Sequence, residues 1–286
     1  MVKVLRVSWL RNPIFMQIFQ FKKFNVINER SAMKVNTDGV LLGAAMTLAQ
    51  TDHRLLDIGT GTGTIALMAA QRLTDLKNIV QDASVGGESL SEASAGTSVE
   101  ISQEIQIDAI DIDEPSASEA KSNFEQSPWA ANLCAHNLSL DDFAATLKSA
   151  EQGVKYDLIF SNPPYFEDSL TAPDERKSMA RHTSDGLSYR DIFDFAQNHL
   201  TSNGRVALVL PSDQEIAICR YARMSGMHLL KVLRVRTVPR KAPSRIIIEF
   251  SRQRPNGVED TILTIQNEGQ YTQEYLSLTK DFYLFA

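Results

Sequence analysis

Hydrophobic residues along the chain fall into short continuous runs that alternate with longer stretches of helical periodicity. The short runs predict buried strands at residues 53–58, 105–113, 156–160 and 204–210. The longer stretches predict helices at residues 40–49, 64–72, 116–124, 189–200 and 213–224. Strands that alternate with helices predict βαβ units, and therefore an α/β fold with a mostly parallel sheet and helices on both faces.

The C-terminal part of the chain changes this alternation. Residues 228–235 and 246–250 both read as strands, and only a basic, proline-containing loop separates them. A loop of this kind favours a hairpin, so we expect one antiparallel strand at the edge of the sheet. Thr37 or Asp38 is expected to cap the helix that begins at residue 40. Further short strands are predicted at residues 19–26, 137–140 and 261–265.

The 286 residues suffice for one large domain or two small ones, and no internal repeat divides them. Residues 1–17 lack the unbroken apolar stretch of a signal peptide, and we expect them to form a flexible basic arm. Residues 79–104 are rich in Ser, Gly, Ala and Glu, which predicts a disordered insertion. Residues 18–286 are therefore expected to form a single domain.

Composition excludes several classes of protein. Hydrophobic residues make up 43% of the chain and charged residues 22%, close to the average of globular proteins. No apolar run approaches about 18 residues, so we expect no membrane-spanning helix. Cys134 and Cys219 are too few for a disulfide framework or a four-cysteine zinc site, and they fit a reducing, cytoplasmic environment.

The net charge of −6 is unevenly distributed. No acidic residue precedes Glu29, and residues 231–254 hold eight bases against the single acid Glu249. Local basic patches rather than net charge determine the binding of polyanions, so these segments are candidates for contact with a nucleic acid. Ordinary solvated surface is the alternative interpretation.

The first candidate site follows the strand predicted at residues 53–58. Asp57 is succeeded by Gly59, Gly61 and Gly63, and glycines let a backbone turn sharply and approach a ligand closely. In an open α/β sheet, ligands bind beyond the carboxyl ends of the strands. The spacing G-x-G-x-G differs from the dinucleotide pattern G-x-G-x-x-G, so the loop alone identifies no particular ligand.

An acidic residue ends the next predicted strand. Asp111 at this position can accept hydrogen bonds from both hydroxyls of a ribose, with Asp113 as the competing candidate. Without the predicted insertion, Asp111 lies near the usual distance of about 20 residues from a nucleotide-binding loop. We therefore predict a ribose contact at this strand end.

A rigid turn follows the strand predicted at residues 156–160. In Asn162-Pro163-Pro164-Tyr165 the prolines fix the backbone and remove N–H donors. The side-chain oxygen of Asn162 and the carbonyl of Pro163 then form two fixed acceptors, which suit a planar amino group. Tyr165 can stack on a flat substrate. A simple Pro-Pro turn would explain the segment alone, but not its place after a glycine loop and a strand-end acid.

These three segments, in this order, resemble the class I S-adenosylmethionine-dependent methyltransferases of the N-P-P-Y type, which modify planar nitrogen. Flanking segments narrow the resemblance to the bacterial tRNA1(Val) (adenine(37)-N6)-methyltransferase family. They are Phe19-x-Phe21-Lys-x-Phe24, M-K-V-x-T-D-G-x-L-L-G at residues 33–43 and E-Y-x-x-L-T-x-x-F-Y-L at residues 274–284. The resemblance begins near residue 18 and implies a Rossmann-like class I methyltransferase fold with a seven-stranded sheet.

The resemblance also implies roles for single residues, with S-adenosylmethionine as the cofactor. The methionine part of the cofactor is expected against Lys34, Thr37, Asp38, Asp57, Gly59, Gly61 and Gly63. Its ribose is expected against Asp111 and its adenine against Ile112 and Asp141, with Asp142 as the alternative to Asp141. The catalytic set that would hold the target adenine is Asn162, Pro163, Pro164 and Tyr165, with Asn162 also bordering the cofactor.

The implied reaction is methyl transfer to N6 of an adenine in tRNA, at position 37 beside the anticodon. Two acceptors on the amino group would stabilise the developing positive charge, so no dedicated general base is expected. The five histidines are scattered without a cysteine or acid at ligand spacing, so we expect no metal. Residues 234–245 and the basic arm are expected to contact phosphates. Residues 176–182 either border the target pocket or form a polar loop.

Three alternatives remain at this stage. A protein glutamine amide or guanine N2 in rRNA could replace adenine as the planar nitrogen. A dinucleotide-dependent oxidoreductase would use the glycine loop but leave N-P-P-Y unexplained. A non-catalytic RNA-binding module would leave the cofactor residues without a purpose.

Overall fold

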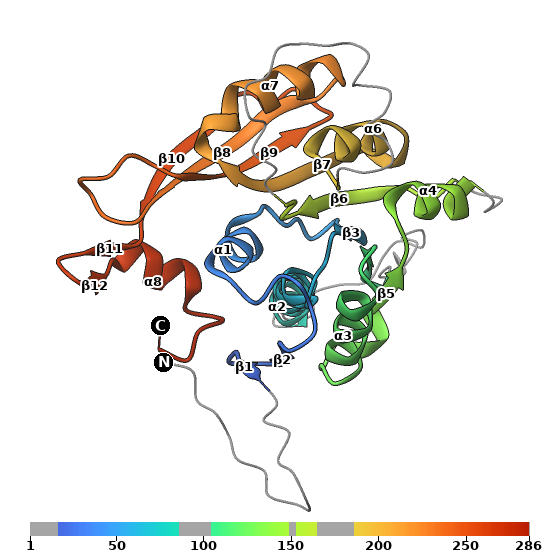
Figure 1. The fold of residues 1–286 in the computed structure, drawn as a ribbon, viewed down its shortest axis with the longest axis horizontal. Helices are drawn as coiled ribbons and strands as arrows, with labels where there is room; N and C mark the ends of the chain where they lie inside the picture. Colours follow the sequence, from blue (N-terminus) through green and yellow to red (C-terminus); the bar gives the residue numbers. More distant parts are fainter. Residues whose placement is uncertain (1–16, 86–103, 149–152, 165–185, 286) are drawn as a thin grey trace, which may run out of the picture.

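The computed structural model describes residues 17–85, 104–148, 153–164 and 186–285. At its centre, eight strands form one sheet in the spatial order β10-β8-β9-β7-β6-β3-β4-β5 (Figure 1). The strands are β3 (Arg54–Ile58), β4 (Gln106–Asp111), β5 (Leu133–Asn137), β6 (Tyr156–Ser161), β7 (Leu200–Pro211), β8 (His228–Arg236), β9 (Arg245–Ser251) and β10 (Glu259–Thr264). Tyr165, residues 176–182, most of the predicted arm and residues 86–103 of the predicted insertion lie outside the described residues.

Helices cover both faces of the sheet, as predicted. One face carries α1 (Thr37–Ala45), α2 (Thr64–Val85) and α3 (Glu114–Glu125), and the other carries α4 (Leu140–Lys148), α6 (Tyr189–His199) and α7 (Glu215–Met224). Leu55 packs in the first of these two cores and its neighbour Leu56 in the second. Successive side chains of a strand point to opposite faces, so a strand that is buried on both faces is continuously apolar.

The mostly parallel sheet is confirmed, but the expected position of the antiparallel strand is wrong. β9 pairs antiparallel with both β7 and β8, so it lies inside the sheet rather than at its edge. β10 then adds to β8 in parallel, which makes eight strands rather than seven. The physical reason is the unbroken apolar run Ile246, Ile247 and Ile248, whose side chains are all fully buried. Such a run needs cover on both faces and belongs in a central strand.

The N-terminal segment forms a hairpin rather than the single strand predicted at residues 19–26. β1 (Ile18–Gln20) and β2 (Asn25–Ile27) pair antiparallel, and the N–H of Phe21 donates to the carbonyl oxygen of Phe24 at 2.9 Å to close the turn. Both phenylalanines are buried, and their rings stack with centroids 4.6 Å apart. The alternating apolar pattern of residues 19–26 therefore arises from a hairpin turn that packs on the same side of the sheet as α3, and not from a single strand.

Three predicted element boundaries also differ. Asn36, not Thr37 or Asp38, caps α1, because its Oδ1 accepts from the N–H of Gly39 at 2.8 Å. The strand predicted at residues 137–140 is misplaced: β5 spans Leu133–Asn137, and α4 begins at Leu140. α2 continues to Val85, beyond the predicted end of the helix and the predicted start of the insertion.

Short elements complete the described part of the chain. They are η1 (Ala130–Asn132), η3 (Ser212–Gln214), β11 (Gln266–Asn267), β12 (Gln270–Tyr271) and α8 (Gln273–Thr279). α8 packs beside α1, so a C-terminal helix contacts an N-terminal one. Among the described helices, none is both long and apolar enough to cross a membrane.

Candidate active site

The carboxyl ends of β3, β4 and β6 lie side by side, because β3 pairs in parallel with both of the other strands. The chain proceeds from β3 to β4 and β5 on one side of β3, and then returns to β6 on its other side. In an open α/β sheet this reversal creates a crevice at the carboxyl ends, where ligands bind. The glycine loop, Asp111 and Asn162 directly follow or end these three strands.

The three loop glycines all have left-handed backbone conformations, with φ of 72° at Gly59, 57° at Gly61 and 78° at Gly63. The loop turns back over β4, where the N–H of Gly59 donates to the carbonyl oxygen of Ile110 at 2.9 Å. Close packing also requires a glycine at 63, because a Cβ there would lie 2.5 Å from Cε1 of Phe124. The loop therefore runs tightly past α3 and leads directly into α2.

Asp57 lies at the base of this loop and is fully buried. Its Oδ2 accepts a hydrogen bond from Oγ1 of Thr60 at 2.7 Å, whereas Oδ1 has no hydrogen-bond partner among the described residues. Burial raises the pKa of Asp57 to about 7, against the opposing effect of the Thr60 hydrogen bond. A buried carboxylate with an unsatisfied oxygen is suited to a donor or a cation supplied by a ligand.

The carboxylate of Asp111 is fixed by two backbone groups. Its Oδ2 accepts from the N–H of Gly61 at 2.8 Å and its Oδ1 from the N–H of Asp113 at 2.9 Å. Burial raises the pKa of Asp111 above its ordinary value. Asp113 instead caps α3, since its Oδ2 accepts from the N–H and Oγ of Ser116. Because the helix start occupies Asp113, Asp111 is the better candidate for a ligand contact.

Ile112, next to Asp111, exposes 77% of its surface at this strand end. Beyond it, Asp141 and Asp142 are both exposed in the first turn of α4. Asp142 forms a reciprocal cap with Ser139: its Oδ2 accepts from the Ser139 hydroxyl at 2.7 Å, and its N–H donates to the same hydroxyl at 3.1 Å. Asp142 therefore serves the helix, which leaves Asp141 as the better candidate.

The turn after β6 is joined to the glycine loop. Oγ of Ser161 donates to the carbonyl oxygen of Ile58 at 2.6 Å, which ties the end of β6 to the end of β3. Asn162 and Pro163 are buried directly after this contact, and Pro164 is exposed. The turn therefore begins within a few ångströms of the loop that carries Gly59.

Residues 28–36 pass between the glycine loop and Asn162. Nδ2 of Asn162 donates to Sδ of Met33 at 3.4 Å. A Cβ on Gly61 would lie 3.4 Å from Oγ of Ser31 and 3.7 Å from the carbonyl oxygen of Met33. This segment, which comes from the N-terminus, thus forms a wall shared by the glycine loop and the N-P-P-Y turn.

Lys34, Thr37 and Asp38, which the sequence analysis assigned to the cofactor, lie in or next to this segment. Nζ of Lys34 donates to the carbonyl oxygen of Glu29 at 2.6 Å. Thr37 is exposed at the start of α1. The carboxylate of Asp38 pairs with Nε of Arg245 at 2.9 Å, which joins α1 to the first residue of β9.

Sequence analysis missed a buried carboxylate that anchors this wall. Glu119 of α3 is fully buried. Its Oε2 accepts from the N–H groups of Glu29 and Arg30 at 2.9 and 2.6 Å, and its Oε1 accepts from the N–H of Ser31 at 3.2 Å. Three successive backbone groups are therefore satisfied by one side chain, which fixes the course of the chain just before Met33.

Asn123, one turn further along α3, has a similar function. Its amide accepts from the N–H of Ile27 at 2.7 Å and donates to the carbonyl oxygens of Ile27 and Thr62 at 3.0 and 2.9 Å. It thereby bridges the N-terminal hairpin and the glycine loop. Glu119 and Asn123 are spaced four residues apart beside the buried Ala120 and Phe124, and polar residues on an apolar helix face were the signal that could have revealed them.

The basic residues of segment 234–245, which was expected to contact phosphates, differ in their surroundings. Arg234 is ion-paired with Glu215 at 2.6 Å and also with Asp260, so its charge is directed at the protein. Arg240 and Lys241 are exposed in the loop between β8 and β9. β8 runs in the same direction as β7 and β6, so this loop lies at the same edge of the sheet as Asn162.

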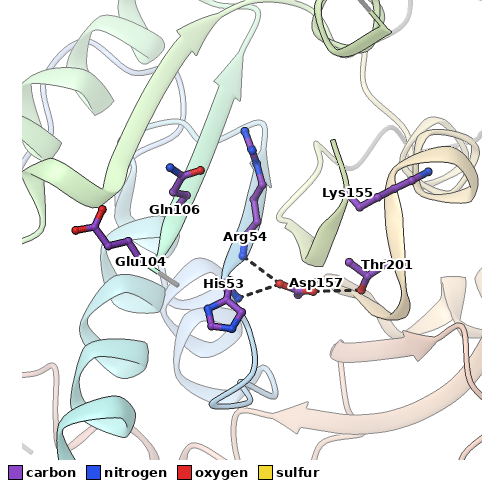
Figure 2. A pocket seen from close by; sticks show the side chains of 7 residues that line it. All are labelled: His53, Arg54, Glu104, Gln106, Lys155, Asp157 and Thr201. Atoms are coloured by element: carbon purple, nitrogen blue, oxygen red, sulfur yellow. Dashed lines mark hydrogen bonds between the residues drawn. The ribbon is translucent and has the colours of Figure 1, made fainter. Parts of the chain in front are cut away.

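A separate cavity of about 440 Å³ lies at the opposite edge, at the amino ends of the strands (Figure 2). Asp157 lines this cavity and bonds to two neighbouring strands. Its Oδ2 accepts from the N–H groups of His53 and Arg54 at 2.9 and 3.1 Å, and its Oδ1 accepts from the hydroxyl of Thr201 at 3.2 Å. Both oxygens of the Asp157 carboxylate therefore have hydrogen-bond partners within the protein. This cavity contains none of the candidate residues.

Comparisons with known proteins agree with this geometry. A family model described as "RMKL-like, methyltransferase domain" matches residues 41–237. A tRNA1(Val) (adenine(37)-N6)-methyltransferase from Parabacteroides distasonis is 37% identical over 267 residues, covering 93% of this chain and 97% of the relative. A protein of the same name from Bacteroides fragilis is 36% identical over 266 residues, covering 93% of this chain and 97% of the relative.

The fold has a counterpart among solved structures. The crystal structure of a predicted O-methyltransferase from Agrobacterium tumefaciens superposes with a TM-score of 0.53 at 14% identity, covering 86% of this chain and 96% of the other. The identity is too low to carry more than the fold, which is that of a class I methyltransferase. With the two relatives that match nearly along their whole length, the chain belongs to the tRNA1(Val) (adenine(37)-N6)-methyltransferase family.

Proposed function

We propose that this protein transfers a methyl group from S-adenosylmethionine to N6 of adenine 37, beside the anticodon of tRNA1(Val). The observation that carries the proposal is the convergence of a glycine loop, a buried Asp57 and the Asn162 turn at one crevice. The names of the full-length relatives supply the substrate. A tRNA substrate also implies that the enzyme works in the cytoplasm.

The residues at the crevice fit this cofactor. The unsatisfied Oδ1 of Asp57 would receive the cofactor's ammonium group, and the left-handed turns at Gly59 and Gly61 would let the backbone approach its methionine part closely. Asp111 would accept from the ribose hydroxyls, Ile112 would pack on the adenine ring, and Asp141 would accept from the adenine amino group. When bound, S-adenosylmethionine supplies an electrophilic methyl group on a sulfonium.

The chain's own contribution is orientation and charge stabilisation. An exocyclic adenine nitrogen is a poor nucleophile, because its lone pair is delocalised into the ring. The side-chain oxygen of Asn162 and the carbonyl of Pro163 would each accept one amino hydrogen, which favours a tetrahedral nitrogen whose lone pair is localised and no longer shared with the ring. The same acceptors stabilise the positive charge that develops on nitrogen. The proton then leaves to water, so no general base is required.

A base beside the anticodon is already in a single-stranded loop, so little energy is needed to turn it out. Tyr165 would stack on it, which is worth about 1–3 kcal/mol per base in other proteins. Arg240 and Lys241, exposed at the same edge as Asn162, would contact the tRNA backbone.

The test uses the full chain, labelled S-adenosylmethionine and an unmodified tRNA1(Val) transcript. After nuclease digestion, label is expected in N6-methyladenosine by mass spectrometry. The matched control is the same transcript with guanosine at position 37, which should accept no label. Label in a release factor or in rRNA guanine, offered in parallel, with none in the tRNA would reject the proposed substrate and retain the methyltransferase.

A further inference from the structure

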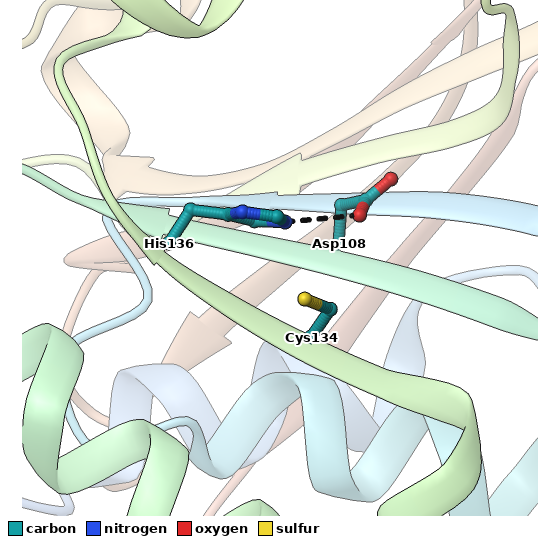
Figure 3. A group of neighbouring side chains, drawn as sticks. All are labelled: Asp108, Cys134 and His136. Atoms are coloured by element: carbon teal, nitrogen blue, oxygen red, sulfur yellow. Dashed lines mark hydrogen bonds and ion pairs between the residues drawn. The ribbon is translucent and has the colours of Figure 1, made fainter.

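The sheet brings together three potential metal ligands that are not among the residues assigned to the crevice and that were not recognised as a group from the sequence. Asp108 is on β4, and Cys134 and His136 are on the edge strand β5 (Figure 3). The parallel register places Cys134 directly beside Asp108, and His136 two residues further on faces the same side. One ligand atom from each residue lies within 4.8 Å of the other two.

The geometry of the nitrogen and oxygen ligands is close to that of a bound ion. Nε2 of His136 and Oδ1 of Asp108 are hydrogen-bonded at 3.1 Å, and two ligands about 2 Å from one metal ion would lie at a similar separation. The Cys134 thiol lies within 4.8 Å of a ligand atom of each of the other two residues and can supply a third ligand. These donors, nitrogen, sulfur and oxygen, are the set that zinc uses in proteins.

The carboxylate of Asp108 is already oriented by neighbouring strands. Its Oδ2 accepts from Nη2 of Arg54 at 3.1 Å and from the hydroxyl of Tyr156 at 2.9 Å. These two contacts leave Oδ1 directed at His136. Outer partners of this kind fix a ligating carboxylate and offset its negative charge, as they do around established metal centres.

An entry path is present as well. The Asp108 side chain is only 14% exposed, whereas His136 is 30% exposed and Cys134 lies on the outer strand of the sheet. An ion can therefore reach the thiol and the imidazole from solvent, with the carboxylate beneath them.

We propose that Asp108, Cys134 and His136 form a binding site for a thiophilic divalent cation such as Zn²⁺, with water in the fourth position. Binding releases the thiol proton of Cys134 to solvent and leaves the imidazole neutral, with its proton on Nδ1. The site would staple the edge strand β5 to β4. It is separate from the methyl-transfer crevice, so its existence does not depend on the proposed substrate.

The test is a titration of the metal-free full chain with Co²⁺, followed by displacement with Zn²⁺. The wild type should develop a thiolate-to-cobalt charge-transfer band that saturates at one equivalent and disappears with Zn²⁺. Cys219→Ser, which removes the other cysteine, should keep the band, and Cys134→Ser should lose it. His136→Ala keeps the thiol and should weaken Co²⁺ binding by about tenfold or more.

Thermal unfolding gives a second readout that does not depend on colour. Zn²⁺ should raise the Tm of the wild type and of Cys219→Ser but not of Cys134→Ser. Circular dichroism of each metal-free variant shows whether it is folded. Absence of the band in the folded wild type, or its persistence in folded Cys134→Ser, would overturn the proposal and leave Asp108 as an ion-pair centre for Arg54.

Discussion

The side-chain amide of Asn162 donates to the sulfur of Met33 at 3.4 Å, although the two residues are 129 positions apart. The contact joins the turn after β6 to the segment that precedes α1. Sulfur is a weak acceptor, so the contact directs the amide without strongly competing for it. The N-terminal segment is therefore a part of the candidate site and not only a packing element.

Asn162→Ala should abolish most methyl transfer. Loss of one preorganised polar contact to a developing charge lowers kcat by about 100-fold or more in other enzymes. The cofactor Kd should stay nearly unchanged, because the glycine loop and Asp111 are untouched. Steady-state kinetics with tRNA and calorimetry with S-adenosylmethionine measure the two quantities. Unchanged turnover would refute the assignment of the acceptor pair.

Asp57→Asn should stabilise the fold in a pH-dependent way. The pKa of Asp57 is raised from 3.8 to about 7, so the folded state retains a proton that the unfolded state has lost between these values. Wild-type stability therefore falls as pH rises through this window. At pH 8 the variant, which has no buried charge, should be more stable by about 1–3 kcal/mol, and this difference should shrink as pH falls and vanish only below the unfolded pKa of 3.8.

Urea unfolding between about pH 3.5 and 8, which spans the whole window, measures this difference. The exposed Asp213, changed to Asn, is the control and should show no comparable gain. The Asp57 variant should also bind S-adenosylmethionine more weakly, since it lacks the carboxylate for the ammonium group. A variant that is equally destabilised at every pH would contradict the burial argument.

Gly63→Ala should destabilise the protein by about 2–4 kcal/mol, through a left-handed backbone and a steric overlap with Phe124. Gly226→Ala is a matched control, because Gly226 has a φ of 75° and no atom within 4 Å of an added Cβ. The difference between the two variants in urea unfolding isolates the overlap. Equal losses would mean that α3 moves away freely.

Glu119→Gln should weaken cofactor binding through the wall formed by residues 28–36. An amide has one acceptor oxygen, so an N–H of residues 29–31 would lose its partner and the segment would loosen. We expect about 1–3 kcal/mol of lost stability and a raised KM for S-adenosylmethionine. Glu125→Gln, exposed at the end of the same helix, should change neither. A variant with lower stability but unchanged KM would make Glu119 purely structural.

The sequence was most informative where a strand ends in unusual chemistry. Asp57, the three loop glycines, Asp111 and Asn162 could be placed at one edge because parallel strands align their carboxyl ends. It was least informative where tertiary contacts decide. Asn36 caps α1 in place of its polar neighbours, and Ile246–Ile248 enter the middle of the sheet although their short loop indicates only a hairpin.

The wall of the site illustrates the same limit. Glu119 and Asn123 act on residues that are about 90 positions away in the chain, so no local spacing connects them. Only their polarity on an apolar helix face hints at a buried function. The ligand pair Asp108 and His136 is likewise created by strand register and not by a motif.

The central position of β9 also determines when the sheet can be completed during synthesis. β7 acquires its second neighbour, and β8 its first, only after the ribosome has made residues 245–251. Until then the apolar edge of β7 and the whole of β8 have no partner strand, and unpaired edges are the segments most prone to aggregation. The nascent chain therefore carries the glycine loop and Asn162 in an incomplete sheet, which can close only after residue 251 has been made.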